Sequence, residues 1–183
     1  MSPTAVIITG PGFEDSEVIY PFYRLQEAGF RVSLATTTDN AVNGKHGNPA
    51  TPTITLKELD PDRFDMLVVP GGYEAPDRMR QIPGILEFTR AMFQRGKVVT
   101  SICHGPWVLV SAGILEGRKA TSYKGCKDDV INAGATYLDQ PVVVDGHLVT
   151  AQRYQDNAAW MKETLSVFAR LHDEAAVGEP AAR

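Results

Sequence analysis

The segment KVVTSICHGP, residues 97–106, combines a short apolar run with an abrupt break. The run that ends at Ile102 predicts a buried strand, because an apolar run bounded by turn residues is typical of a strand covered on both faces. Gly105 leaves out a side chain where the backbone must turn, and Pro106 suits the first turn of a helix, where its missing N–H needs no partner. We therefore predict a strand that turns directly into a helix, with Cys103 at the turn.

The same alternation of strand and helix continues on both sides of this segment. Apolar runs predict strands at 4–9, 30–35, 64–69 and 97–102, and helical spacing predicts helices at 15–28, 83–94, 103–112 and 158–171. Asp145-Gly146 joins strands at 142–144 and 148–150 into an antiparallel hairpin, and residues 36–52 form a loop with room for a smaller one. This order predicts an α/β fold whose mostly parallel sheet is covered by helices.

A chain of 183 residues is long enough for one domain with a buried core and short for two. We expect a single domain over 1–183, with its core at about 4–171 and a loose tail at 172–183, which is small, charged and contains proline. The 18 basic and 22 acidic residues give a net charge of −4 without a basic cluster, which argues against a nucleic-acid partner.

The composition also predicts where the protein works. The N-terminus lacks the basic start and apolar stretch of a signal peptide, and no window approaches the ~18 apolar residues of a membrane span. Two cysteines, Cys103 and Cys126, do not make a disulfide framework. We expect a soluble, cytoplasmic protein that contacts no membrane.

Cys103 is the candidate nucleophile. Ligands of open parallel sheets bind beyond the carboxyl ends of the strands, and Cys103 follows such a strand directly. Because a helix N-terminus favours an anion, we expect the pKa of this thiol to lie below its free value of ~8.5. The alternative is a small core residue, since free cysteines are often buried.

Three further positions could assist this thiol. His104 could act as a base, although neighbours on a regular helix do not face one another, so the pairing needs an irregular turn. Glu14 follows the first predicted strand and is either a site carboxyl or a solvated acid of the first helical turn. The backbone N–H groups of Gly71 and Gly72 are either oxyanion donors or part of a plain turn.

Neither a cofactor nor a metal is expected. The segment 10–12 resembles the start of a dinucleotide fingerprint, but Asp15 stands at the third glycine position and would repel a pyrophosphate. His46 and His147 have no Cys or carboxylate at metal-ligand spacing. Cys126 is interpreted as a structural residue.

The segment Ser101-Ile-Cys-His-Gly-Pro106 resembles the cysteine elbow of the PfpI family of intracellular proteases, in the DJ-one superfamily of class I glutamine amidotransferase-like proteins. The resemblance covers about residues 4–171. Other motifs that resemble the family, in the same order, are Gly12-Phe-Glu-Asp15 with Glu17 and Pro21, Gly44-Lys-His-Gly47, Pro70-Gly-Gly72, Thr121-Ser-Tyr-Lys-Gly125, Lys127-Asp-Asp129 and Ile131-Asn-Ala-Gly134.

This resemblance implies a flavodoxin-like fold, with Cys103 as the nucleophile and Glu14 as the carboxylic acid held against its sulfur. Tyr123 would line the pocket. Trp107, just after the elbow, either narrows the pocket or packs in the core.

The resemblance also implies homodimers that can build into hexamers. In the protease-like members an acidic residue of a neighbouring subunit orients the histidine that corresponds to His104. Here the loop departs from the family pattern, because the position of that glutamate holds the shorter Asp77, and Glu74 is an insertion. Either acid could complete a triad, or neither.

The leading hypothesis is action on small reactive carbonyls such as methylglyoxal, as in glyoxalases and deglycases of this superfamily. Cys103 would form a hemithioacetal, backbone N–H groups near Gly72 and His104 would hold its oxyanion, and Glu14 or His104 would move the proton. The second hypothesis is peptide or amide hydrolysis by the same thiolate, and the third is a stress protein that senses oxidants or acts as a chaperone.

Overall fold

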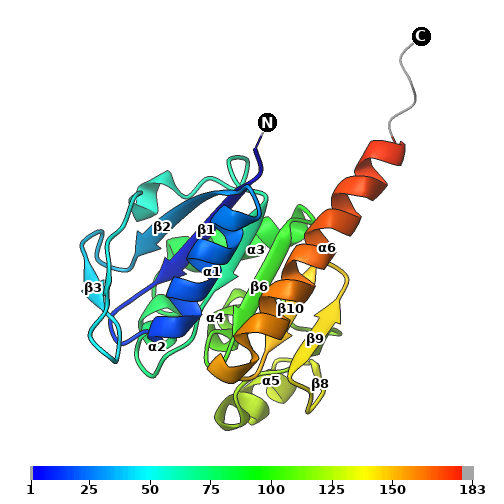
Figure 1. Cartoon of the computed structure of the whole chain (residues 1–183). Helices are drawn as coiled ribbons and strands as arrows, with labels where there is room; N and C mark the ends of the chain where they lie inside the picture. Colours follow the sequence, from blue (N-terminus) through cyan, green and yellow to red (C-terminus); the bar gives the residue numbers. More distant parts are fainter. Residues whose placement is uncertain (1, 179–183) are drawn as a thin grey trace.

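A six-stranded sheet forms the middle of the molecule (Figure 1), in the order β2-β1-β5-β6-β10-β9. The computed structural model describes residues 2–178. The strands are β1 (Thr4–Thr9), β2 (Arg31–Thr36), β5 (Met66–Val69), β6 (Val98–Ile102), β9 (Val142–Asp145) and β10 (Leu148–Ala151). All neighbours are parallel except β9, which pairs antiparallel with β10 as the predicted hairpin. The five parallel strands therefore follow the 2-1-3-4-5 order of flavodoxin-like folds, which confirms the expected fold.

Helices cover both faces of this sheet. On one face, α1 (Asp15–Glu27) packs beside α6 (Asn157–Gly178), and both cross in front of the strands in Figure 1. The other face carries α3 (Pro83–Gln94) and α4 (Pro106–Ala112), which pack together, with α2 (Ala75–Met79) and α5 (Lys127–Asn132) against α4. The remaining strands are short pairs, β3 (Val42–Asn43) with β4 (Pro49–Ala50) and β7 (Lys119–Ala120) with β8 (Thr136–Tyr137).

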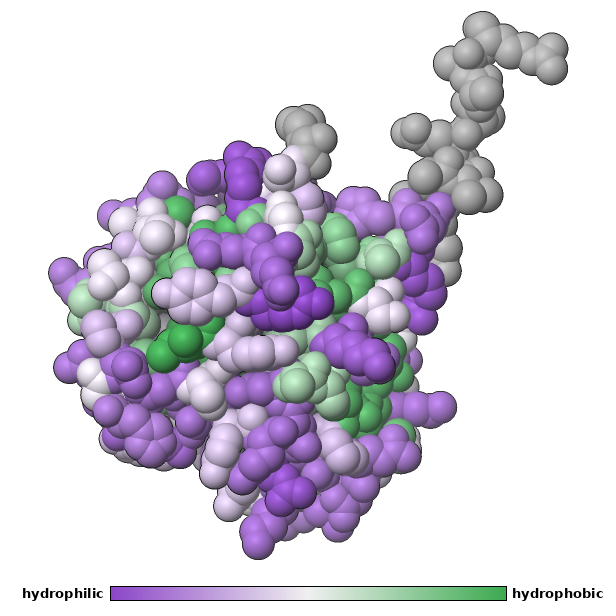
Figure 2. Space-filling model, in the orientation of Figure 1, coloured by the Kyte–Doolittle hydropathy of each residue, from purple (hydrophilic) through white to green (hydrophobic). Residues whose placement is uncertain are grey.

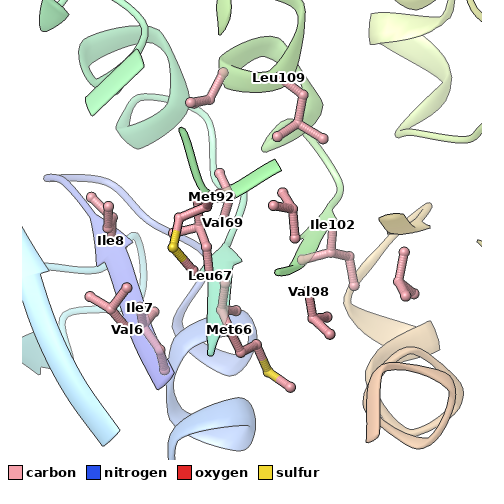
Figure 3. Packing of buried hydrophobic residues seen from close by; sticks show 14 of the residues in the cluster. Val6, Ile7, Ile8, Met66, Leu67, Val69, Met92, Val98, Ile102 and Leu109 are labelled. Carbon is pink, nitrogen blue, oxygen red and sulfur yellow. The ribbon is translucent and has the colours of Figure 1, made fainter. Parts of the chain in front are cut away.

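The core lies where the central strands meet these helices. Every residue of β5 and β6 is buried, because parallel strands are covered on both sides and therefore read as continuous apolar runs. Figure 3 shows Met92 of α3 and Leu109 of α4 packing with residues of the strands. This core holds the ends of β1, β5 and β6 in fixed positions, which matters because the site lies at those ends.

The structure differs from the predicted elements at two places. The predicted tail begins at 172, whereas α6 continues to Gly178, and residues 179–183 of that tail lie outside the described residues. Ala175 and Ala176 are strong helix formers, which favours continuation of the helix beyond 171. The sequence does not predict the short helices α2 and α5. A helix of one or two turns contains too few apolar residues to show a helical repeat.

The surface combines hydrophilic and apolar residues (Figure 2). Figure 2 shows hydrophilic residues over most of one face, with smaller apolar areas between them. Among residues 2–178, no helix has both the length and the apolar character that a membrane crossing requires.

Candidate active site

The elbow between β6 and α4 turns sharply, as the sequence predicts. Cys103 adopts a φ of 61°, in the left-handed region that non-glycine residues rarely occupy and that costs about 1–3 kcal/mol. Gly105 makes the turn possible, because a Cβ there would lie 2.4 Å from the backbone oxygen of Val69. The strained conformation directs the Cys103 side chain away from the strand and into a cleft. Strain of this kind is found at functional sites.

The cleft has a volume of about 570 Å³. It opens where β1, β5 and β6 end, which includes the switch point between β1 and β5 where flavodoxin-like folds bind ligands. Five of the predicted site residues line it: Glu14, Gly72, Cys103, His104 and Tyr123. Among the lining residues that the sequence did not predict are Lys45, Tyr73, Lys124, Arg153 and Tyr154.

His104 faces the sulfur. Its Nδ1 lies 3.2 Å from Cys103 Sγ, and the irregular turn at Cys103 is what lets two sequence neighbours meet. Burial, and then the charge of Lys45, lower the pKa of His104, so the imidazole is held in its neutral form at neutral pH. A neutral imidazole at this distance can accept the thiol proton.

A correction concerns the carboxyl group that lies against the sulfur, which belongs to Glu17 and not to Glu14. Glu17 is fully buried in the first turn of α1. A Cβ placed on Gly71 would lie 2.6 Å from Cβ of Cys103 and 2.7 Å from Oε2 of Glu17, so the two side chains are neighbours. One carboxyl oxygen accepts the N–H of Gly71 at 2.8 Å. Burial raises the pKa of Glu17 to about 8, and the charge of Glu14 adds to this rise. Glu17 is therefore an acid that exchanges its proton near neutral pH.

The sequence contained a signal for Glu17 that the prediction did not use. Glu17 lies four residues before Pro21, and both face the sheet together with Val18 and Leu25. A carboxyl group on the buried stripe of a helix needs a partner inside the protein. For Lys45, on the loop between β3 and β4, we find no such pattern.

Glu14 lies in the cleft, where a cation pairs with it. Its carboxylate forms an ion pair with Lys45, lies 3.9 Å from Nε2 of His46 and accepts a hydrogen bond from Ser16 at 3.2 Å. Asp15 holds this loop in place by accepting the backbone N–H of His46 at 2.9 Å. Glu14 therefore lines the cleft near the thiol as one member of an ion pair.

The expectation of a lowered Cys103 pKa is also wrong. Burial first, and then the charge of Glu17, raise the pKa of Cys103, and the N–H groups of Gly72 and His104 offset only part of this rise. The helix N-terminus that follows Cys103 was expected to lower the pKa of the thiol, but desolvation and a like charge outweigh that effect. Because the two acids are coupled, the thiolate is favoured when Glu17 holds a proton and carries no charge.

The two glycines after β5 have different roles. The N–H of Gly72 lowers the pKa of the Cys103 thiol, and Gly72 has a φ of 111°, a conformation that suits glycine. Gly71 was predicted as an oxyanion donor, but its N–H is already donated to Glu17, so that prediction is wrong. A Cβ at Gly71 would lie 2.6 Å from Cβ of Cys103, which explains why the position has no side chain.

Trp107 does not line the cleft. Its indole N–H donates to Asp129 Oδ2 at 2.9 Å, and its ring lies beside His104, so the expected narrowing of the pocket is not observed.

The two loop acids do not contact His104 within the chain. Asp77 is exposed and accepts a hydrogen bond from Gln81, and Glu74 pairs with Arg78. Their roles toward a neighbouring subunit stay predictions. Among residues 2–178, no three His, Cys, Asp or Glu side chains are grouped as metal ligands.

Comparisons with known proteins identify relatives over most of the chain. The chain is 49% identical over 151 residues to deglycase PfpI of Pyrococcus furiosus, covering 82% of this chain and 90% of that relative. It is 42% identical to protein/nucleic acid deglycase 2 of Escherichia coli, covering 88% and 94%.

A solved structure gives the same result for the fold. A two-domain protein of Anabaena variabilis, with DJ-1/ThiJ/PfpI-like and ferritin-like domains, superposes with a TM-score of 0.87 at 37% identity. The match covers 90% of this chain and 47% of that protein. The model of the DJ-1/PfpI family matches residues 3–167, and the chain belongs to that family.

Proposed function

We propose that this protein is a cofactor-independent cysteine enzyme of the deglycase type, which removes small dicarbonyls such as methylglyoxal from their adducts. The observation that carries the proposal is the position of Cys103 in the cleft, with Sγ 3.2 Å from His104 Nδ1 and the side chain beside the buried Glu17. Relatives named deglycases, at 49% and 42% identity, support an enzyme of this type.

The first step forms a bond from sulfur to carbon. His104 takes the thiol proton, and Cys103 Sγ attacks the carbon that carries the adducted amine or thiol. The bond from that carbon to nitrogen or sulfur breaks, and the leaving group takes a proton from His104. A hemithioacetal of the dicarbonyl remains on Cys103.

The second step moves a proton between adjacent carbons. The ionised form of Glu17, which becomes populated as pH approaches its pKa of about 8, takes the proton from the carbon attached to sulfur and returns it to the neighbouring carbonyl carbon. The hydroxyl proton of the first carbon passes to the oxygen of the second. The N–H groups of Gly72 and His104 stabilise the oxygen that gains negative charge. The product is a thioester, which water hydrolyses to a 2-hydroxy acid and free Cys103.

A second candidate function is peptide hydrolysis. The observation in its favour is again the contact of Cys103 with His104, and one relative, YraA of Bacillus subtilis, carries cysteine protease in its name. This activity needs an acid that orients His104 from outside the chain, a role for which Asp77 and Glu74 are the candidates.

The test uses a purified adduct of methylglyoxal with N-acetylarginine. Lactate release is measured together with the rate at which the adduct dissociates without enzyme. We expect lactate to appear faster than this dissociation in the wild type and not at all in Cys103→Ala. Cys126→Ala is the matched control, because it removes the other thiol, which is fully buried and does not line the cleft.

Two outcomes would contradict the proposal. If lactate forms only as fast as the adduct dissociates, the enzyme acts on free methylglyoxal and not on adducts. If the adduct is stable but a fluorogenic peptide is cleaved in a Cys103-dependent way, the peptidase is the correct assignment.

We also propose that the protein assembles as a homo-oligomer in the cytoplasm. Ile19 and Tyr23 on the outer side of α1 are 38% and 65% exposed, and large apolar groups in this position favour a protein contact. Light scattering of the wild type and of Tyr23→Glu measures this, with a smaller particle expected for the variant.

A further inference from the structure

His104 lies between two aromatic rings. Tyr123 stacks on one side, with ring centroids 4.7 Å apart and planes inclined by 25°. Trp107 meets His104 with its ring turned by 69° and its centroid at 5.2 Å. The imidazole is therefore held both along its face and at its edge, in addition to its contact with Cys103.

Trp107 itself is fixed from outside the cleft. Its indole N–H donates to Asp129 Oδ2 at 2.9 Å, and the Arg80 guanidinium lies 5.6 Å from the ring centroid. Arg80 is held in turn, because its Nε donates to Ser111 at 2.9 Å. Arg80 directly follows α2 and Asp129 belongs to α5, so two elements outside α4 determine where the Trp107 ring stands.

We propose that Trp107 is a positioning residue, which clamps His104 against Tyr123 so that Nδ1 stays within reach of Cys103 Sγ. The inference rests on the proposed function, because it assigns a role toward the same thiol. It also names a source of orientation within the chain itself, whereas Asp77 and Glu74 make their contacts away from His104.

The physical reason is that an imidazole ring turns easily about its side-chain bonds. Without Trp107, His104 loses its edge contact and can rotate so that Nδ1 moves away from the sulfur. A displacement of about 1 Å in a catalytic group can lower a rate by about 100-fold. Packing alone does not account for the arrangement, because Trp107 is only partly buried and yet has both a hydrogen bond and a cation–π contact.

The experiment compares Trp107→Leu with two references. Val110→Ala, on the same helix and also partly buried, controls for a general loss of packing. The His104→Ala background tests whether Trp107 acts through His104. The first readout is the rate at which iodoacetamide alkylates Cys103 at pH 7, followed by mass spectrometry so that Cys126 is counted separately. This readout needs no substrate.

We expect Trp107→Leu to slow alkylation of Cys103 by about 10-fold, while Val110→Ala stays within about twofold of the wild type. In the His104→Ala background, Trp107→Leu should change the rate by less than about twofold. Equal rates in Trp107→Leu and Val110→Ala, or a loss that persists without His104, would overturn the proposal.

A second pair of variants leaves the indole ring in place. Asp129→Ala removes the tether of Trp107, and Asp128→Ala removes a neighbouring exposed acid that has no hydrogen bond or ion pair among the described residues. We expect Asp129→Ala to slow alkylation in the same direction as Trp107→Leu, and Asp128→Ala to have no effect. If both variants are alkylated at the wild-type rate, the hydrogen bond from Trp107 to Asp129 does not position the indole ring.

Turnover of the methylglyoxal adduct is the last readout. We expect kcat to fall in Trp107→Leu with little change in KM, because substrate contacts are kept. If the wild type shows no turnover, the proposed function fails, whereas the alkylation rates still decide whether Trp107 positions His104.

Discussion

Glu14 and Glu17 stand three residues apart at the start of α1 and reach the same thiol site with opposite properties. Both are almost fully buried. Glu14 lies beside a cation, Lys45, and two further polar groups. Glu17 accepts the N–H of Gly71 and lies beside Cys103 without a cation as partner, and its pKa rises to about 8.

The difference shows that the nature of the partner, more than the degree of burial, determines whether a buried carboxyl group keeps its charge or binds a proton. A carboxylate with an ammonium partner keeps its charge at little cost, whereas one without a cation binds a proton instead. The start of α1 thus supplies a carboxylate paired with Lys45 at Glu14 and a group that exchanges protons at Glu17. Each of the following changes tests one side of this comparison.

The largest effect is expected for Glu17→Gln. The amide has the same shape and can still accept the N–H of Gly71, but it cannot exchange a proton, so turnover should fall by about 1,000-fold. Alkylation of Cys103 at pH 9 should instead become faster, because Glu17 is charged there in the wild type and raises the pKa of the thiol. The two readouts are expected to move in opposite directions. A parallel fall in both would mean that Glu17 only supports the structure.

The same pair of acids shows what the sequence could and could not predict. The strands agree with the structure within two residues at each end, because apolar runs and glycine breaks are local signals. The elbow was predicted for the same reason, since Gly105 and Pro106 adjoin Cys103.

Choosing between Glu14 and Glu17 required the tertiary structure. The sequence places Glu14 nearer the end of β1, but α1 turns that residue toward the loop of Lys45 and turns Glu17 toward β5. The pKa of Cys103 was missed for a related reason. The helix terminus is visible in the sequence, whereas burial and the charge of Glu17 arise only when β1, β5 and β6 are brought together.

The next effect concerns stability. The pKa of Glu17 is raised from 4.5 in the unfolded chain to about 8, so the folded protein holds an extra proton between these pH values. Its contribution is therefore most favourable below the lower value and is lost as pH rises to the upper one. Relative to Glu17→Gln, the wild type should lose up to about 1.4 kcal/mol of unfolding free energy per pH unit in this range. Urea denaturation of both proteins from pH 5 to 9 measures this, and parallel curves would contradict the raised pKa.

Glu14→Gln should have a smaller effect, which acts through Glu17. The charge of Glu14 raises the pKa of Glu17 and that of Lys45 lowers it, so removing Glu14 leaves Lys45 unopposed and the pKa of Glu17 should fall. We expect turnover at neutral pH to decrease by about 10-fold or less. The pH profile of Cys103 alkylation should shift to higher pH, because Glu17 becomes charged at lower pH and then raises the pKa of the thiol. Lys45→Met is the matched control, because it should shift the same profile in the opposite direction. Shifts of the same sign would show that the two side chains act by shape and not by charge.

The smallest effect is expected for Ser16→Ala. The Ser16 hydroxyl donates to Glu14 at 3.2 Å, while Lys45 remains as the charged partner of that carboxylate. A distance of 3.2 Å is long for a hydrogen bond from a hydroxyl to a carboxylate, and Lys45 remains to hold Glu14, so turnover and the alkylation profile should stay within about twofold of the wild type. Thermal unfolding of Ser16→Ala provides the second measurement, with a shift of a few degrees expected. If Ser16→Ala impairs turnover as much as Glu14→Gln, the orientation of Glu14 depends on the hydroxyl group and not on Lys45, and the contrast with Glu17 would rest on geometry in place of charge.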